Sequence, residues 1–225
     1  MINLSGQRIL VTQAQDFMGP ALCVMLAQCG AEVIADERLL TAPQDAQAMV
    51  DAAGPLDALV INLALPAPST PVTHIDEAEW RQVFEVMVDP LPRLVRAVVP
   101  GMKARGGGKI VVMGSASALR GMKRAASYSA ARGAQLAYVQ AAGVELAPDN
   151  IQLNAVAQNF VDNPTYFPPE VQANPRFQER LKREVPLGRL VKAEEDASFV
   201  AYLCSDAASC FVGQVFPMSG GWAVR

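Results

Sequence analysis

Short runs of consecutive apolar residues alternate along the chain with longer segments of helical pattern. The apolar runs lie at 8–12, 31–35, 58–62, 109–113 and 151–157, with a last one near 212–218. The helical segments lie at 18–30, 77–105, 125–147 and 194–205. Strands without polar alternation are buried on both faces, so this order predicts a parallel sheet covered by helices on both sides. We expect an α/β fold in which residues 1–225 form a single doubly wound, Rossmann-like domain.

Composition excludes several classes of protein. Hydrophobic residues make up 51% of the 225 residues and charged residues 18%, which excludes a disordered chain. The formal net charge is −3 and the basic residues are scattered, so we expect neither a nucleic-acid footprint nor a membrane-binding face. No apolar run reaches the ~18 residues that a membrane helix needs, and the N-terminus has no leader pattern. The sequence therefore predicts a soluble, cytoplasmic protein.

Cysteine and histidine usage limits the available chemistry. The four cysteines lie in apolar neighbourhoods without CxxC spacing, which predicts buried free thiols and no metal site: Cys23, Cys29, Cys204 and Cys210. His74 is the sole histidine, so Ser-His-Asp catalysis would depend on it entirely.

The turn after the first apolar run lacks the glycines of a phosphate-binding loop. A dinucleotide fold needs glycines there so that the pyrophosphate can approach backbone N–H groups. Here Gln13, Asp16 and Phe17 occupy the turn, and only Gly19 is glycine. The turn is either an ordinary β-to-α connection or a nucleotide site that has been filled in. Both interpretations predict no NAD(P) cofactor, and Asp36 is then a strand-end residue rather than a ribose ligand.

Ser115, Tyr128 and Arg132 form a candidate catalytic group. Tyr128 and Arg132 are four residues apart, so in a helix they share a face. A guanidinium beside a phenol favours the phenolate, which would make Tyr128 a general base at neutral pH. Ser115 follows an apolar run and can hydrogen-bond the same substrate oxygen. A Tyr-x-x-x-Arg pair alone is more often a surface aromatic beside a solvated charge, but the additional serine favours catalysis.

These motifs resemble those of the halohydrin dehalogenases within the short-chain dehydrogenase/reductase superfamily. The superfamily signature is Ser followed by Tyr-x-x-x-Lys, and the dehalogenases carry Arg in place of Lys, as at Arg132. They also replace the glycine-rich turn with a pattern that Thr12, Phe17 and Gly19 match. The segments 157–168 and 185–190 resemble the halide-binding loop and the segment after it, and Gln158 departs by standing where some relatives carry Pro.

The resemblance implies a cofactor-independent carbon–halogen lyase. Such an enzyme converts vicinal halo-alcohols to epoxides, releases halide and a proton, and opens epoxides with small anions in reverse. Backbone N–H groups near Phe160 and Val161 would hold the departing halide. The implied halide- and substrate-binding residues are Phe17, Gln158, Asn159, Phe160, Val161, Tyr166 and Phe167. The partners are then a halo-alcohol or epoxide and a halide ion.

The resemblance also implies a homotetramer. The helices at 77–105 and 125–147 would form the four-helix contact between subunits. Val139 and Ala142 on the second helix are small or apolar enough for close packing.

Two other functions remain open from the sequence. One is an NAD(P)-dependent short-chain oxidoreductase, which would need the missing glycines. The other is a non-catalytic relative that uses the fold for binding, against which the intact Ser115, Tyr128 and Arg132 argue.

Overall fold

Six parallel strands form one sheet in the computed structural model, which describes residues 2–224. The strand order is β2-β1-β3-β4-β5-β6, so the chain reverses its direction of winding beside β1. The strands are β1 (Arg8–Thr12), β2 (Glu32–Asp36), β3 (Ala58–Ile61), β4 (Gly108–Ser115), β5 (Ile151–Gln158) and β6 (Val215–Met218). The predicted doubly wound α/β fold is confirmed.

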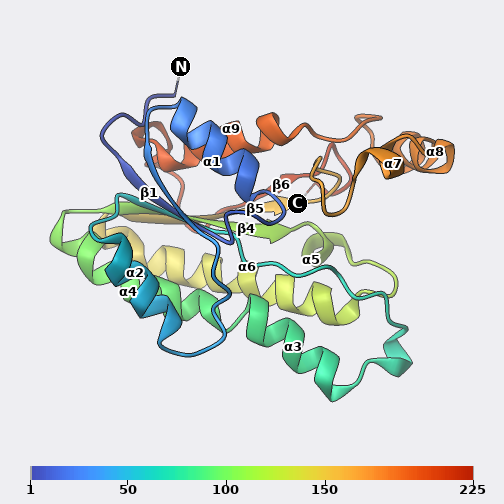
Figure 1. The fold of residues 1–225 in the computed structure, drawn as a ribbon, viewed down its shortest axis with the longest axis horizontal. Helices are drawn as coiled ribbons and strands as arrows, with labels where there is room; N and C mark the ends of the chain where they lie inside the picture. Colours follow the sequence, from blue (N-terminus) through green and yellow to red (C-terminus); the bar gives the residue numbers. More distant parts are fainter. Residues whose placement is uncertain (1, 225) are drawn as a thin grey trace.

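Helices cover both faces of the sheet (Figure 1). On one face lie α1 (Gly19–Gln28) and α9 (Ala193–Cys204), which pack together. On the other lie α2 (Asp45–Ala53), α3 (Glu77–Met87), α4 (Pro90–Ala104) and α6 (Ala126–Leu146). The short helices are α5 (Ser117–Arg120), α7 (Pro169–Gln172), α8 (Pro175–Glu184) and the 3₁₀ turns η1 (Val72–His74), η2 (Ala147–Asp149) and η3 (Asp206–Ala208).

Two hydrophobic clusters explain why the strand sequences are apolar at every position. Leu10, Leu59 and Ile110 face α2, α4 and α6, whereas Val11, Val60 and Val111 face α1 and α9. Alternate side chains of each strand thus enter opposite cores, as expected for a parallel sheet covered on both sides.

The helical segments differ from the prediction in several places, among them α8, which lies in a Pro-rich stretch that was expected to be irregular. The helix predicted over 77–105 is broken: α3 ends at Met87 and α4 begins at Pro90, whose missing N–H suits a first helical turn. α2 was not predicted, although its buried residues Ala46, Met49, Val50 and Ala53 repeat with helical spacing.

The prediction of buried thiols is wrong for Cys210, which is exposed, and correct for Cys204; Cys23 and Cys29 are half-buried. All four are free thiols. Within residues 2–224, no group of three or more potential metal-ligating side chains occurs, and no helix is both long and apolar enough to span a membrane.

The carboxyl ends of the strands meet along one edge of the sheet, where open α/β sheets bind ligands. The register places Ser115, at the end of β4, directly opposite Gln158, at the end of β5. Thr12 ends β1 at the same edge, so the three candidate regions of the sequence converge there.

Candidate active site

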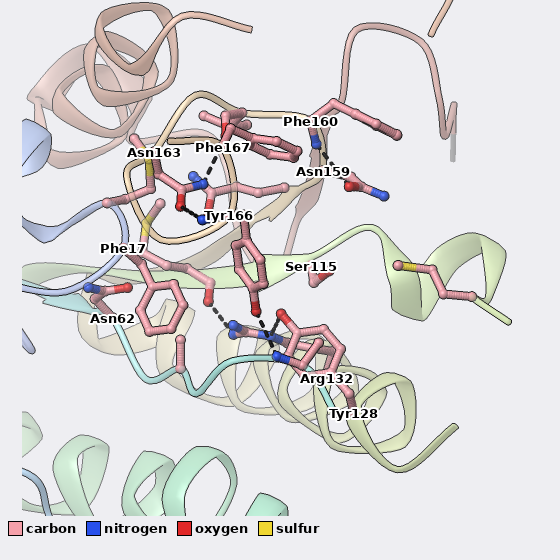
Figure 2. A pocket seen from close by; sticks show the side chains of 18 of the residues that line it. Phe17, Asn62, Ser115, Tyr128, Arg132, Asn159, Phe160, Asn163, Tyr166 and Phe167 are labelled. Carbon is pink, nitrogen blue, oxygen red and sulfur yellow. Dashed lines mark hydrogen bonds between the residues drawn. The ribbon is translucent and has the colours of Figure 1, made fainter. Parts of the chain in front are cut away.

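A cavity of about 270 Å³ lies at this edge of the sheet, roofed by the segment after β5 (Figure 2). All ten site residues predicted from the sequence line it: Phe17, Ser115, Tyr128, Arg132, Gln158, Asn159, Phe160, Val161, Tyr166 and Phe167. His74, in contrast, is exposed on η1 and is not part of the lining.

Arg132 contacts Tyr128 as the helical spacing predicts. Its Nε donates to the Tyr128 hydroxyl at 3.1 Å, and both side chains are buried. Nη1 donates to the carbonyl oxygens of Met113 at 2.8 Å and Leu63 at 3.1 Å, which fixes the guanidinium in place. No carboxylate among residues 2–224 forms a salt bridge with Arg132, so its charge is available to a phenolate.

Gln135 holds Arg132 from the next turn of α6. Its Oε1 accepts from Arg132 Nη1 at 2.9 Å, and its Nε2 donates to the Met87 carbonyl at 2.6 Å. The break after α3 therefore has a structural consequence, because Met87 at the end of that helix anchors the residue that orients Arg132.

Ser115 has a second serine beside it. The two hydroxyl oxygens of Ser115 and Ser117 are 3.0 Å apart, and the Ser117 N–H donates to Ser115 Oγ at 3.2 Å. Hydroxyl protons rotate, so Ser117 can donate to Ser115 while Ser115 donates to a ligand in the cavity. Both residues are buried, and Ser115 reaches the cavity wall.

The turn after β1 keeps a left-handed backbone without glycine. Gln13 has φ 44° and Phe17 has φ 51°, a region that favours glycine. The Gln13 side chain compensates by accepting from the Ala64 N–H at 2.8 Å, and Asn62 Nδ2 donates to the carbonyls of Gln13 and Asp16, each at 3.0 Å. These bonds tie the turn to the segment after β3.

Phe17 and Tyr166 meet across the edge of the sheet. Their ring centroids are 5.6 Å apart. The Tyr166 hydroxyl accepts from the Ala67 N–H at 3.0 Å and donates to the Leu65 carbonyl at 3.2 Å. Burial, followed by the proximity of Tyr128, raises the pKa of Tyr166, which keeps this phenol neutral. Of the two phenols that face each other in Figure 2, only Tyr128 receives the Arg132 hydrogen bond.

The predicted halide loop is held by its own asparagines. Asn163 Oδ1 accepts from the Tyr166 N–H at 2.9 Å, and Asn163 Nδ2 donates to the Val161 carbonyl at 2.9 Å. The Phe160 N–H already donates to Asn159 Oδ1 at 2.9 Å. Of the two backbone donors that the sequence singled out, only that of Val161 lacks an acceptor within the described part of the chain.

A matching family model identifies the chain's relationships. The model described as Enoyl-(Acyl carrier protein) reductase matches residues 5–223, nearly the whole chain. The chain belongs to the short-chain dehydrogenase/reductase superfamily. Cis-4-hydroxycyclohexanecarboxylate dehydrogenase of Sinomonas cyclohexanicum is 30% identical over 95% of both chains, and 2-keto-3-deoxy-L-fuconate dehydrogenase of Xanthomonas campestris is 30% identical over 98% of this chain and 81% of its own.

Solved structures show the same superfamily fold. A protein described as a dehalogenation enzyme is 35% identical, with a TM-score of 0.92 over 99% of this chain and 100% of its own. L-sorbose reductase of Gluconobacter frateurii, complexed with NADPH and L-sorbose, is 23% identical with a TM-score of 0.89 over 97% of each chain. At that identity the likeness shows the fold alone.

This superfamily member departs from the dinucleotide-binding arrangement of its fold. The crevice beside β1, where a dinucleotide would lie, is crossed by the Phe17–Tyr166 contact and by the bonds from Tyr166 to the segment after β3. At the ribose position, partial burial acts to raise the pKa of Asp36, but hydrogen bonds from Arg38 outweigh it and lower that pKa. Asp36 is thus already bound by a neighbouring side chain. The residues present do not fit NAD(P).

Sequence reasoning missed several residues of the site. Ser117, Gln135 and Asn62 act on the predicted residues through hydrogen bonds that only the fold brings about. Arg180 on α8 lines the cavity mouth and stacks on Phe160, with its guanidinium 5.3 Å from the ring centroid. Helical periodicity could have marked Gln135, which is one turn from Arg132 on the same face.

Proposed function

We propose that this superfamily member is a cofactor-independent halohydrin dehalogenase, a carbon–halogen lyase. The observation that carries the proposal is a complete Ser115–Tyr128–Arg132 group facing a cavity whose nucleotide side is closed by Phe17 and Tyr166. The substrate is a vicinal halo-alcohol, and the products are an epoxide, a halide ion and a proton. Epoxide opening by small anions is the reverse reaction.

Tyr128 acts as the general base in the proposed mechanism. Arg132 stabilises the phenolate through its 3.1 Å contact, and Ser115 donates to the substrate oxygen. The substrate proton passes to Tyr128, and the resulting alkoxide forms a bond to the neighbouring carbon as the carbon–halogen bond breaks. Nucleophile and leaving group belong to one molecule, so the site needs mainly to enforce their anti geometry. Tyr128 then returns its proton to solvent.

The halide leaves toward the loop after β5. The Val161 N–H has no acceptor among the described residues and is one backbone donor there, and rotation of Asn159 would release the N–H of Phe160. Phe167 stacks on Phe160 with centroids 6.1 Å apart, and with Phe17 and Tyr166 it forms an aromatic wall that excludes water from the reacting carbon.

The comparisons support this proposal through the dehalogenation enzyme at 35% identity. Relatives at about 30% identity are dehydrogenases, which favour the alternative of an NAD(P)-dependent oxidoreductase. We prefer the lyase because an oxidoreductase of this fold needs the crevice that Phe17 and Tyr166 fill.

A paired assay tests the proposal. Protein is mixed with a vicinal bromo-alcohol without any nucleotide, and bromide release is followed; NADH and NADPH are titrated separately. We expect bromide release and no nucleotide binding. Near-stoichiometric nucleotide binding without bromide release would instead establish the oxidoreductase. Tyr128→Phe, checked for native circular dichroism, controls for uncatalysed release.

A further inference from the structure

A buried carboxyl group that does not line the cavity contacts Gln158, and the mechanism does not use it. Asp196, in the first turn of α9, is 0% exposed. Its Oδ2 accepts from Gln158 Nε2 at 2.6 Å, while its Oδ1 has no hydrogen-bond partner within the described part of the chain. A half-satisfied buried carboxylate is costly, so a structural role alone does not explain it.

Basic side chains of the packed elements do not offset this carboxyl group. Neither α1, β5 nor β6 carries an Asp, Glu, Lys, Arg or His, and the titratable group of α1 is the Cys23 thiol. β4 carries Lys109 at the end opposite Ser115, where its Nζ donates to Gln152 at 2.7 Å and to Ser209 at 2.8 Å. Lys109 is therefore hydrogen-bonded at the opposite edge of the sheet and does not neutralise Asp196.

The neighbouring segments add acidic groups and few cations. The acidic side chains of α9 besides Asp196 are Glu194 and Glu195, and Lys192 is the residue at its N-terminal cap. Glu195 forms a salt bridge with Arg189. The loop after β5 adds Asp162, which Gln172 binds. On the cavity side of Gln158, the charged or titratable groups are Tyr128, Arg132, Tyr166 and Arg180.

Burial raises the pKa of Asp196 to about 7, against the opposing hydrogen bond from Gln158. The backbone N–H groups at the start of α9 favour the ionised form of Asp196, but they offset the effect of burial only in part. Protonated and ionised forms are therefore both populated near neutral pH.

The ionised form requires one orientation of the Gln158 amide, whereas the protonated form also permits the opposite one. An ionised Asp196 only accepts hydrogen bonds, so the Gln158 amide group must face it, as observed, and the Gln158 carbonyl is left for the cavity. A protonated Asp196 can donate to that carbonyl after the amide rotates, which turns the NH₂ group toward the cavity. An NH₂ group binds an anion, whereas a carbonyl oxygen repels it.

We propose that Asp196 is a positioning residue that couples anion binding in this cavity to uptake of one proton. Gln158 connects the two events, because its amide group can rotate when Asp196 changes its protonation state. The anion is halide or another small monovalent anion, so the inference rests on the proposed function. Halide binds tightly when Asp196 is protonated and leaves when Asp196 ionises. The coupling assists product release, because halide escapes more readily as the carboxyl loses its proton.

The test is a bromide titration at several values of pH, followed by the fluorescence of Trp222, whose ring lies edge-on to Phe160 with centroids 6.2 Å apart. Tyr128→Phe is the background, so that the proposed general base is absent from the cavity. We expect the bromide Kd to rise by up to about tenfold per pH unit above about pH 7. Asp196→Asn, which never ionises, is expected to give a pH-independent Kd close to the low-pH value. Asp206→Asn, on η3 and outside the cavity lining, is the matched control and should keep the pH dependence.

Calorimetry on the unmutated protein provides a measurement that does not depend on a variant folding. Titrations near pH 7 in buffers of different ionisation enthalpy should show fractional proton uptake per bromide bound, and an absence of proton uptake would overturn the coupling. A bromide Kd that does not vary with pH, or that varies equally in Asp196→Asn, overturns the coupling while leaving the anion pocket standing. No bromide binding at any pH, together with no bromide release from a halo-alcohol, overturns the proposed function as well.

Discussion

Arg132 is the single residue on which the proposed chemistry depends most. Its guanidinium donates to four acceptors, and no carboxylate within residues 2–224 pairs with it. Its positive charge therefore lies next to the Tyr128 hydroxyl without a negative charge to neutralise it. Arg132→Lys keeps a positive charge but loses the planar guanidinium and its several hydrogen-bond donors, so we expect slower turnover at every pH.

Arg132→Gln removes the charge altogether. We expect turnover to fall and the midpoint of the pH–rate profile to move to higher pH, because no positive charge then favours the phenolate that accepts the substrate proton. A pH–rate profile of the variant with an unshifted midpoint and undiminished activity would show that Arg132 does not govern the base.

The two hydroxyls are expected to be catalytic rather than structural. Tyr128→Phe should lower kcat by at least about a hundredfold, since general-base catalysis contributes that much or more. Ser115→Ala should also abolish most turnover. Each should change the free energy of unfolding by only about 1 kcal/mol, because one hydroxyl at a cavity wall is lost. Steady-state kinetics and urea unfolding of the same preparations separate the two effects, and a Tyr128→Phe variant with substantial turnover would remove Tyr128 from the mechanism.

Asp196 makes stability depend on pH with a definite sign. Its pKa of about 7 is higher than in an unfolded chain, so the folded protein binds the proton more tightly. Its ionisation therefore destabilises the folded state progressively as pH rises from about 4 to about 7. Relative to Asp196→Asn, the unmutated protein should lose up to about 4 kcal/mol across that range. Urea unfolding of both proteins at several pH values measures this loss. If the free energy of unfolding changed with pH in the same way in both proteins, the raised pKa of Asp196 would be contradicted.

Among the elements, the turn between β1 and α1 decides what the fold can bind. A Cβ atom at Gly19 would lie 2.5 Å from the carbonyl carbon and oxygen of Ala14, so the turn has no room for a side chain there. We expect Gly19→Ala to destabilise the protein by about 2 kcal/mol or more. Gly101→Ala, at an exposed position of α4, should instead stabilise the protein by about 0.5–1 kcal/mol, because its Cβ meets only the end of the Arg105 side chain at 3.4 Å. Thermal unfolding of both compares the two positions, and equal effects would contradict the steric argument.

The strands and the site differ in how far the sequence predicts them. Runs such as 58–62 predict strands because both faces are buried, and the Ser115–Tyr128–Arg132 spacing predicts a shared cavity. The break at 88–89 has no such signal, since the prolines of α4 fit a helix start as well as a kink. Asp196 was missed because no local pattern connects it to Gln158, 38 residues away.

At the scale of the whole molecule, the structure changes which surface can join subunits. Val139, predicted to lie in a contact between subunits, is instead 0% exposed against the sheet, and Ala142 is half-buried beside it. The open face of α6 carries Ala137, Ala141 and Val144, and Val144 is 68% exposed.

We expect a homotetramer that uses this open face. Light scattering at micromolar concentration should give four times the chain mass, and Val144→Lys should reduce it by placing a charge in the contact. Val224→Lys, at another exposed apolar position, is the control. A monomer at every concentration would contradict the assembly.

The most informative measurement is the product stoichiometry of nucleotide-free protein acting on a vicinal bromo-alcohol. We expect equal amounts of bromide, proton and epoxide, unchanged when NAD⁺ or NADP⁺ is added, because the closed crevice beside Phe17 leaves no route for hydride transfer. Formation of a ketone that requires NAD⁺ or NADP⁺, with no bromide released, would contradict the proposed lyase.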